Sequence, residues 1–260
     1  MILVAYGLIP PLYWLTPVST FMHSNPDARE RSAWRDLALY SMLALLVLLA
    51  WDFSGLDFAV MQLLGDSRGF GWKDNWWLET MLHTRARQLA GVVLFSLVLM
   101  IWLPQAWFRG LSRLQRIEIV VGIVWCLLCI STLKRVSLTS CPWDLQDFGG
   151  PAVYVSHWRW GVSDGGAGHC FPGGHASSAL AFLGICLPWL TNATPGARQR
   201  GRLLLLCVVV CGMVLGMTQT VRGAHYPSHT LWTGLICWAV ALANHWGFDR
   251  FAHRSARFRP

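Results

Sequence analysis

His175 and His225 are the two residues of this sequence whose settings best suit the transfer of a phosphoryl group. His175 follows a Phe-Pro-Gly-Gly stretch that includes Gly173 and Gly174, and it stands where a long apolar run begins. A glycine-rich turn that opens a helix exposes backbone N–H groups, and these groups bind anions together with the helix dipole. A histidine at this place can pass a proton to an ester oxygen. The plainer interpretation is a helix cap that carries a surface histidine.

A second segment, Thr218–His229, brings together two histidines and an arginine. His225 and His229 are four residues apart and would share one face of a helix that starts early. Arg222 stands three residues before His225, where its guanidinium could clamp a phosphate group. Two histidines at this spacing also suit zinc, but no further ligand stands at a metal-site spacing. We therefore predict no metal.

The composition points to lipid as the solvent of the chain. Of its 260 residues, 54% are apolar and only 13% are charged, whereas soluble domains carry about 25% charged residues. The apolar residues form six runs that we predict to span a membrane. These runs are Leu37–Trp51, Leu89–Trp107, Ile117–Leu133, Ala176–Leu190, Leu203–Val221 and Thr230–Ala243. The predicted fold is all-α, a six-span transmembrane helical bundle whose extracytoplasmic loops carry the active site.

The N-terminal stretch Ile2–Met22 is also apolar, but it contains three prolines and no basic leader region, so it does not resemble a signal peptide. We expect residues 1–36 to form a cytoplasmic or interfacial segment, or the natural chain to start at Met22. Residues 37–260 would then form a single six-helix membrane domain.

Lysine and arginine assign an orientation to the predicted spans, because both are enriched in cytoplasmic loops. With both termini in the cytoplasm, the inside segments hold thirteen of the 21 basic residues, and the outside loops carry no net charge. We therefore predict an inner-membrane protein with cytoplasmic termini and a periplasmic active site. The net charge of +8 then reflects the excess of basic residues in the predicted cytoplasmic segments. No basic patch with interleaved aromatic residues indicates nucleic-acid binding.

Two long outside loops follow from this orientation. Asp52–Arg87 mixes apolar residues with tryptophans, and we expect one or two short helices on the membrane surface. They would serve as an anchor or as a gate for lipids. Lys134–Gly174 is rich in glycine and aromatic residues, and a loop of this length is usually functional when it is ordered. Its first residue, Lys134, could be no more than a snorkelling anchor at the end of a span.

The cysteines agree with this orientation. Six of the eight lie in the predicted spans, where a thiol behaves as a small apolar group, and only Cys141 and Cys170 lie in an outside loop. Two cysteines in an oxidising compartment predict a disulfide. It would close a loop of about 30 residues and stabilise the fold by roughly 3–4 kcal/mol. The alternative is a pair of buried free thiols.

Together these segments resemble the type-2 phosphatidic acid phosphatase superfamily, the integral-membrane lipid phosphate phosphatases. The family pattern reads Lys, six residues, Arg-Pro; then Pro-Ser-Gly-His; then Ser-Arg, five residues, His, three residues, Asp. The corresponding residues are Lys134, six residues, Cys141-Pro142; Pro172-Gly173-Gly174-His175; and Thr218-Gln219, five residues, His225, three residues, His229. The resemblance covers residues 117–243 and keeps the order and spacing of the three motifs.

The resemblance implies a metal-independent reaction through a phosphohistidine. His225 would be the nucleophile, and His175 would protonate the leaving oxygen and later help to activate water. Lys134 and the backbone N–H groups of Gly173 and Gly174 would hold the phosphoryl oxygens. No cofactor is expected, because cationic side chains take the place of Mg²⁺, and nothing indicates an obligate protein partner.

Two family arginines are absent from this sequence. Cys141 stands in place of the arginine of the first motif and Gln219 in place of that of the third. Arg222 and Arg135 are the nearby cations that could replace them. We therefore expect a divergent subgroup in which the phosphate clamp has been rebuilt.

The family aspartate that orients the nucleophile is also replaced, by His229. A neutral His229 could accept a hydrogen bond from the ring of His225, but it would stabilise a charged imidazole less than a carboxylate does. Asp144 or Asp147 could supply that carboxylate instead.

These observations lead to an expected function with two rivals. We expect a phosphatase that hydrolyses a membrane lipid phosphate or pyrophosphate on the periplasmic face. The first rival is a phosphotransferase that passes the phosphoryl group from His225 to an acceptor lipid. The second is a transporter or structural membrane protein, which the shortage of charges within the spans and the absence of a repeat disfavour.

Overall fold

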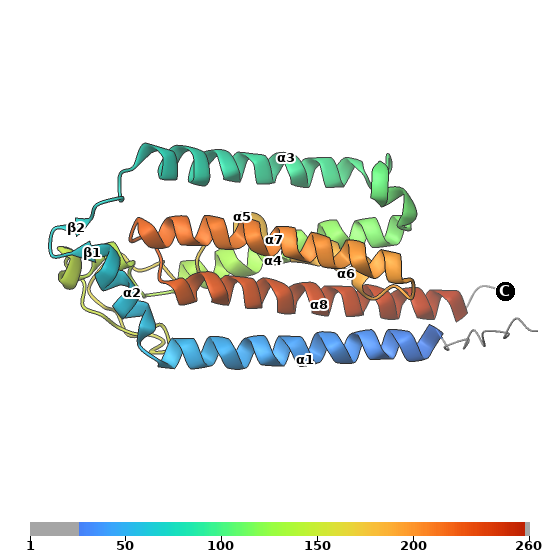
Figure 1. The fold of residues 1–260 in the computed structure, drawn as a ribbon, viewed down its shortest axis with the longest axis horizontal. Coiled ribbons are helices and arrows are strands. Elements are labelled where there is room, and N and C mark those ends of the chain that lie inside the picture. Colours follow the sequence, from blue (N-terminus) through green and yellow to red (C-terminus); the bar gives the residue numbers. More distant parts are fainter. Residues whose placement is uncertain (1–25, 258–260) are drawn as a thin grey trace, which may run out of the picture.

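A computed structural model describes residues 26–257, and nearly all of its elements are helical (Figure 1). The long helices are α1 (Pro26–Phe53), α3 (Ala86–Leu99), α4 (Arg113–Val136), α7 (Pro195–Val221) and α8 (Pro227–Arg257). The short ones are α2 (Leu56–Leu64), α5 (Ser177–Leu180), α6 (Leu187–Leu190), the π-helix η1 (Trp77–Arg85) and the 3₁₀ helices η2 (Ala106–Gly110), η3 (Pro142–Asp144), η4 (Gln146–Phe148) and η5 (Ala181–Cys186). Strands β1 (Gly65–Asp66) and β2 (Gly69–Phe70) form one antiparallel hairpin. The all-α class is confirmed, and the expectation for residues 1–25 lies outside the described residues.

The bundle places six helical stretches side by side: α1, η1 with α3, α4, the continuous α5–η5–α6, α7 and α8 (Figure 1). Three of them are long and apolar enough to cross a membrane, namely Arg31–Phe53 of α1, α4 and α7. The run predicted at Leu89–Trp107 is helical only as far as Leu99 before the η2 turn. Pro104 in this connection cannot continue a helix. The number of spans therefore remains a prediction.

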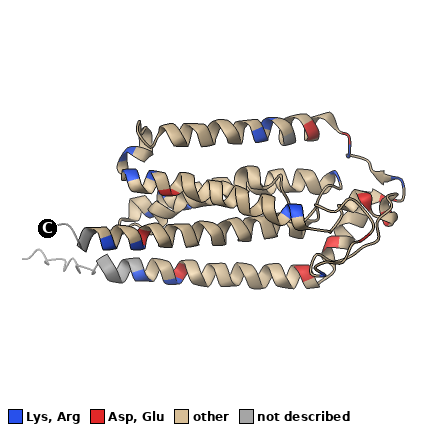
Figure 2. Ribbon diagram, turned by 180° about the vertical axis from the view of Figure 1, so that it is seen from behind, with Lys and Arg blue, Asp and Glu red and all other residues tan. Residues whose placement is uncertain are grey.

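The loops divide between the two ends of the bundle as the basic residues predicted. The start of α1 and the end of α8 lie at one end, and the α1–α3, α4–α5 and α7–α8 connections lie at the other (Figure 1). Charged residues lie mostly toward the ends of the helices, and the middle of the bundle is nearly free of them (Figure 2). The placement of the loops on the two sides of a membrane, and the compartment that each end faces, remain predictions.

The α1–α3 and α4–α5 connections form a cap over the end of the bundle that carries the histidines. Its apolar core contains Met61 of α2, Phe70 of β2 and Phe148 of η4, and Tyr226 from the α7–α8 turn packs into the same cluster. The first of these connections contains the short helix α2, whereas η1 continues directly into α3, and a position on the membrane surface remains a prediction. The cap therefore holds the turn that carries His225.

Small residues let α7 pack closely against its neighbours. A Cβ atom on Gly212 would lie 2.3 Å from the side chain of Leu180, and one on Gly216 would lie 2.2 Å from that of Thr230. Small residues at helix contacts allow this approach in a membrane, where the hydrophobic effect does not drive helices together. Large apolar side chains instead cover the outside of the bundle, as on α1 and α3.

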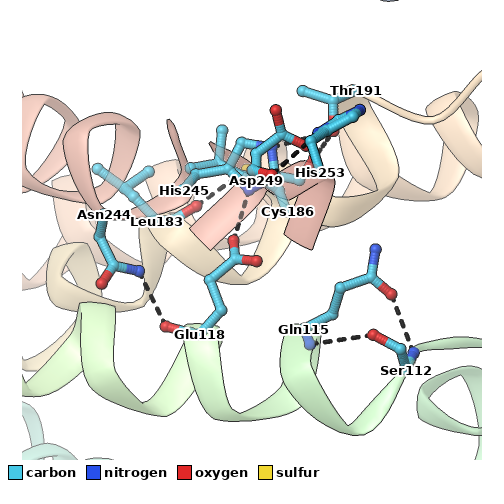
Figure 3. A network of polar contacts seen from close by, with 11 residues as sticks. Ser112, Gln115, Glu118, Leu183, Cys186, Thr191, Asn244, His245, Asp249 and His253 are labelled. Carbon is cyan, nitrogen blue, oxygen red and sulfur yellow. Dashed lines mark hydrogen bonds and ion pairs between the residues drawn. The ribbon is translucent and has the colours of Figure 1, made fainter. Parts of the chain in front are cut away.

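A buried polar contact joins α4 to α8 at the end opposite the cap (Figure 3). The carboxylate of Glu118 pairs with His245 at 2.5 Å, and Asn244 donates a hydrogen bond to the Glu118 carbonyl at 3.0 Å. One turn earlier, Ser112 and Gln115 form a reciprocal capping box that starts α4. Glu118, the one acidic residue within the predicted spans, is therefore partnered.

Candidate active site

His225 and His175 meet at the end of the bundle beneath the cap. His225 lies in the turn between α7 and α8, and His175 lies just before α5. The Nε2 atom of His225 is 3.4 Å from the Nδ1 atom of His175. His225 is 2% exposed and His175 is half-buried. Two segments 50 residues apart therefore bring together the two histidines that the sequence singled out.

Cys170 determines which nitrogen of His225 carries the proton. Its sulfur lies 3.2 Å from Nδ1 of His225, and the His225 ring also hydrogen-bonds to the Cys170 backbone. Cys170 is joined to Cys141 in a disulfide, so its sulfur has no hydrogen to donate. The proton therefore belongs on Nδ1 of His225. Nε2, which faces His175, keeps the free electron pair that a nucleophile needs.

Burial keeps His225 neutral. Removal of the ring from water lowers its pKa well below the ordinary value of 6.5, and the nearby His229, Lys134 and His175 lower it further. The hydrogen bond to the Cys170 backbone opposes this effect only in part. Nε2 therefore remains unprotonated at neutral pH.

Lys134 reaches the site from the last turn of α4. A Cβ atom on Gly174 would lie 3.1 Å from Nζ of Lys134 and 3.3 Å from its Cδ atom. Glycine at this position therefore lets the lysine side chain lie across the backbone next to His175. The lysine is half-buried, and its charge acts on His225.

An open cleft of about 440 Å³ lies between α3, α4 and α5 in front of His175. Its polar lining comprises Arg87, Ser131, Lys134, His175, Ser177 and Ser178, and no acidic residue lines it. Ala90, Ser178 and Phe182 also line an apolar groove of about 470 Å³ between α3, α5–η5 and α7. A cationic cleft therefore continues directly into a groove suited to hydrocarbon.

Arg222 lies away from this cleft. Its Nε donates to the carbonyl of Lys73 at 2.8 Å, and its guanidinium pairs with Glu79 at 3.5 Å and contacts Gln219. These contacts tie the α7–α8 turn to the first loop. The predicted phosphate clamp by Arg222 does not match this geometry, because its guanidinium already has partners elsewhere. Arg135 does not line the cleft either.

The two glycines of the second motif differ in what they can offer an anion. The N–H of Gly173 donates to the carbonyl of His229 at 3.1 Å, so the expected contact between this group and phosphate does not match the structure. Gly174 lines the cleft. Of the two backbone positions, Gly174 is therefore the one placed to face a bound anion.

The predicted orienting groups also lie differently from the expectation. His229 is in the first turn of α8 and donates from Nδ1 to the Cys170 carbonyl at 3.0 Å, while its ring centroid is 5.9 Å from that of His225. Asp144 is in η3, and no described contact joins its carboxylate to His225. Cys170, rather than either of the two predicted residues, therefore contacts Nδ1 of His225.

The predicted disulfide between Cys141 and Cys170 is present. The two sulfur atoms and a ring nitrogen of His225 lie within 4.8 Å of one another, a spacing that could hold a metal ion. Cysteines joined in a disulfide are not thiolates, so this group lacks the donors that a metal prefers.

Two acidic residues of the first loop support the site and were missed by the sequence interpretation. Asp57 accepts a hydrogen bond from the N–H of Ser228 at 3.0 Å and so caps the start of α8. Asp52 pairs with His157 at 3.1 Å, and the His157 ring stacks on Phe171 with centroids 4.1 Å apart. Nothing in the local sequence pairs these residues, because their partners lie more than 100 positions away.

These features describe a mostly helical membrane protein with a cationic cleft that His175 lines and with His225 next to His175. The chain belongs to the PAP2 superfamily, whose family model matches residues 115–252, more than half of the chain. Members of this superfamily are phosphatases that act on phosphate esters, often on lipids. Searches among curated proteins and among solved structures found no match. The resemblance noted in the sequence is therefore confirmed at the level of the superfamily.

Proposed function

We propose that this protein is a six-span, metal-independent phosphatase that hydrolyses a lipid phosphate or pyrophosphate on the periplasmic face of the inner membrane. The continuity of the cationic cleft with the apolar groove between α3 and α7 supports this proposal most directly. A phosphate headgroup fits the cleft, and an acyl or prenyl chain fits the groove. A water-soluble phosphate ester would have no use for the groove.

The first chemical step forms a phosphohistidine. Nε2 of His225 attacks phosphorus with its free electron pair, and the bond from phosphorus to the lipid oxygen breaks. His175 gives its proton to that oxygen, so that the lipid leaves as an alcohol, or as a monophosphate if the substrate is a pyrophosphate. Nε2 of His225 and Nδ1 of His175 are only 3.4 Å apart, so the His175 ring must rotate aside to admit the phosphoryl group.

The second step returns the enzyme to its starting state. His175, now neutral, accepts a proton from water while the water oxygen attacks phosphorus. The bond between phosphorus and Nε2 of His225 breaks and inorganic phosphate leaves. Lys134 stabilises the charge on the phosphoryl oxygens in both steps, because an oriented cation in a partly buried site needs little reorganisation.

The test of this function is phosphate release from a panel of lipid phosphates by the purified protein without added metal. His225→Ala should reduce release by about 10³-fold or more, and His175→Ala by about 10²- to 10⁴-fold, the usual contribution of a general acid and base. His253→Ala is the matched control, because this exposed histidine lies at the far end of α8. Full activity in His225→Ala would rule out the mechanism. Wild-type protein quenched in alkali should carry phosphate that acid treatment then releases, and His225→Ala should lack it.

A further inference from the structure

The three family motifs place fewer cations in the cleft than the charge of a phosphate group requires. Cys141 and Gln219 replace the two family arginines, and Arg222 is bound to Glu79 and to the Lys73 carbonyl. Lys134 is then the one motif cation that lines the cleft. A phosphate monoester carries up to two negative charges, and guanidinium groups bind its oxygens in a forked geometry that lysine cannot supply.

Arg87 is the remaining cation of the cleft. It stands at the second position of α3, and its side chain lines the cleft together with Lys134 and His175. Among the described residues, no carboxylate lies within ion-pair distance of Arg87, and no acidic side chain lines the cleft. Arg87 therefore has no anionic partner within the part of the chain that the structure describes.

We propose that the guanidinium of Arg87 binds the phosphoryl oxygens of the substrate opposite Lys134. This inference rests on the phosphatase function proposed above. It places the missing clamp cation on α3, outside the three sequence motifs and outside the stretch matched by the family model. Because α3 also forms one wall of the apolar groove, the helix that holds the lipid chain carries the residue that holds its phosphate.

The proposal is tested with Arg87→Gln, Arg87→Lys and the matched control Arg85→Gln. Arg85 is exposed two residues earlier, does not line the cleft and bonds to Gln88. The first measurement is the rise in thermal unfolding temperature in detergent when phosphate replaces chloride at constant ionic strength. The second measurement is kcat and KM for phosphate release from a lipid phosphate.

We expect phosphate to raise the unfolding temperature of the wild type and of Arg85→Gln. The rise should be largely lost in Arg87→Gln and partly kept in Arg87→Lys. Arg87→Gln should also lower kcat/KM by about 10- to 100-fold, the usual effect of losing a charged hydrogen bond. Arg85→Gln should remain within about twofold of wild type, as is usual for an exposed residue away from a site.

Each outcome separates this inference from the proposed function. If Arg87→Gln equals Arg85→Gln in both measurements while the wild type releases phosphate, Arg87 is not a phosphate ligand and the function stands. If the wild type binds phosphate through Arg87 but hydrolyses no lipid phosphate, the function fails and the anion site stands. Absence of a phosphate-specific rise in the wild type overturns the inference. If Arg87→Gln does not fold, Arg87→Lys must still show the intermediate effect.

Discussion

At the scale of single residues, His225, the proposed nucleophile, is oriented by a peptide carbonyl and a disulfide sulfur rather than by a carboxylate. Nδ1 of His225 faces Cys170, and His229 donates to the same carbonyl. A carboxylate would favour the charged imidazole, whereas a carbonyl does so much less. Burial therefore dominates, and His225 is held as a neutral ring with Nε2 free for attack.

This arrangement predicts a pH dependence of stability. The pKa of His225 is lowered well below 6.5 in the folded protein, so below pH 6.5 the unfolded chain binds a proton that the folded chain excludes. The stability from this group is complete above about pH 6.5 and is lost as the pH falls from there toward the lowered pKa. The thermal unfolding temperature in detergent should therefore drop more steeply between pH 7.5 and 5 for wild type than for His225→Gln. Parallel curves would contradict a neutral buried His225.

At the scale of the elements, both ends of the α4–α5 loop are attached to the α7–α8 turn that carries His225. Cys141 stands just before η3, and Cys170 stands five residues before His175. In addition, the N–H of Trp143 donates to the carbonyl of Gly223 at 3.0 Å. Gly223 has a φ of +78° and Phe70 packs against it, so another residue would both strain the turn and displace the cap. The loop therefore acts as a frame for His225.

Loss of the disulfide should lower both stability and activity. Cys141→Ser with Cys170→Ser opens a covalent loop that spans 29 positions, which should cost about 3–4 kcal/mol in the chain-entropy model. Phosphate release should fall as well, because Cys170 contacts the nucleophile. Cys129→Ser, which removes a free thiol of α4 that lines neither the cleft nor the groove, is the matched control. Dithiothreitol should reproduce the effect in wild type and leave the double variant unchanged; full activity of the reduced wild type would contradict this role.

At the scale of the whole molecule, α3 stands apart from α7 and leaves the apolar groove between them (Figure 1). The groove opens on the side of the bundle, where large apolar residues such as Leu89 and Val93 are exposed. A lipid could thus bring its phosphate to His175 while its chain remains among the helices. Under the proposed function, the packing of α3 against the bundle would select lipid phosphates over soluble phosphate esters.

The groove predicts a dependence on chain length. Val93→Trp should fill part of the groove and lower kcat/KM for a long-chain lipid phosphate by at least about fivefold relative to a short-chain one, because each buried methylene contributes about 0.8 kcal/mol. Leu43→Trp places the same bulk on the exposed face of α1 and should leave the ratio unchanged. Equal losses on long and short chains would show that the groove does not hold the chain.

The arrangement of the loops predicts their accessibility from outside the cell. Ser67 lies in the cap, and Thr194 lies at the opposite end of the bundle, where α7 begins. A membrane-impermeant maleimide added to intact cells should label Ser67→Cys and leave Thr194→Cys unlabelled. The reverse labelling would place the active site in the cytoplasm and refute the predicted orientation.

The sequence by itself was sufficient to predict the helical membrane class, the disulfide, and the proximity of His175, His225 and Lys134. Each of these depends on local features, namely apolar run length, motif spacing and the side on which charges fall. The same features predict on which side of the membrane each loop lies, and this placement remains a prediction.

Only the tertiary structure decided what surrounds the histidines. Arg222 donates a hydrogen bond to the carbonyl of Lys73, 149 positions away. Arg87 lines the cleft from α3, a helix that contains none of the three motifs. Cys170 takes the orienting place that His229 or Asp144 was expected to fill. These contacts join residues far apart in the chain, and the packing of side chains determines them rather than sequence spacing.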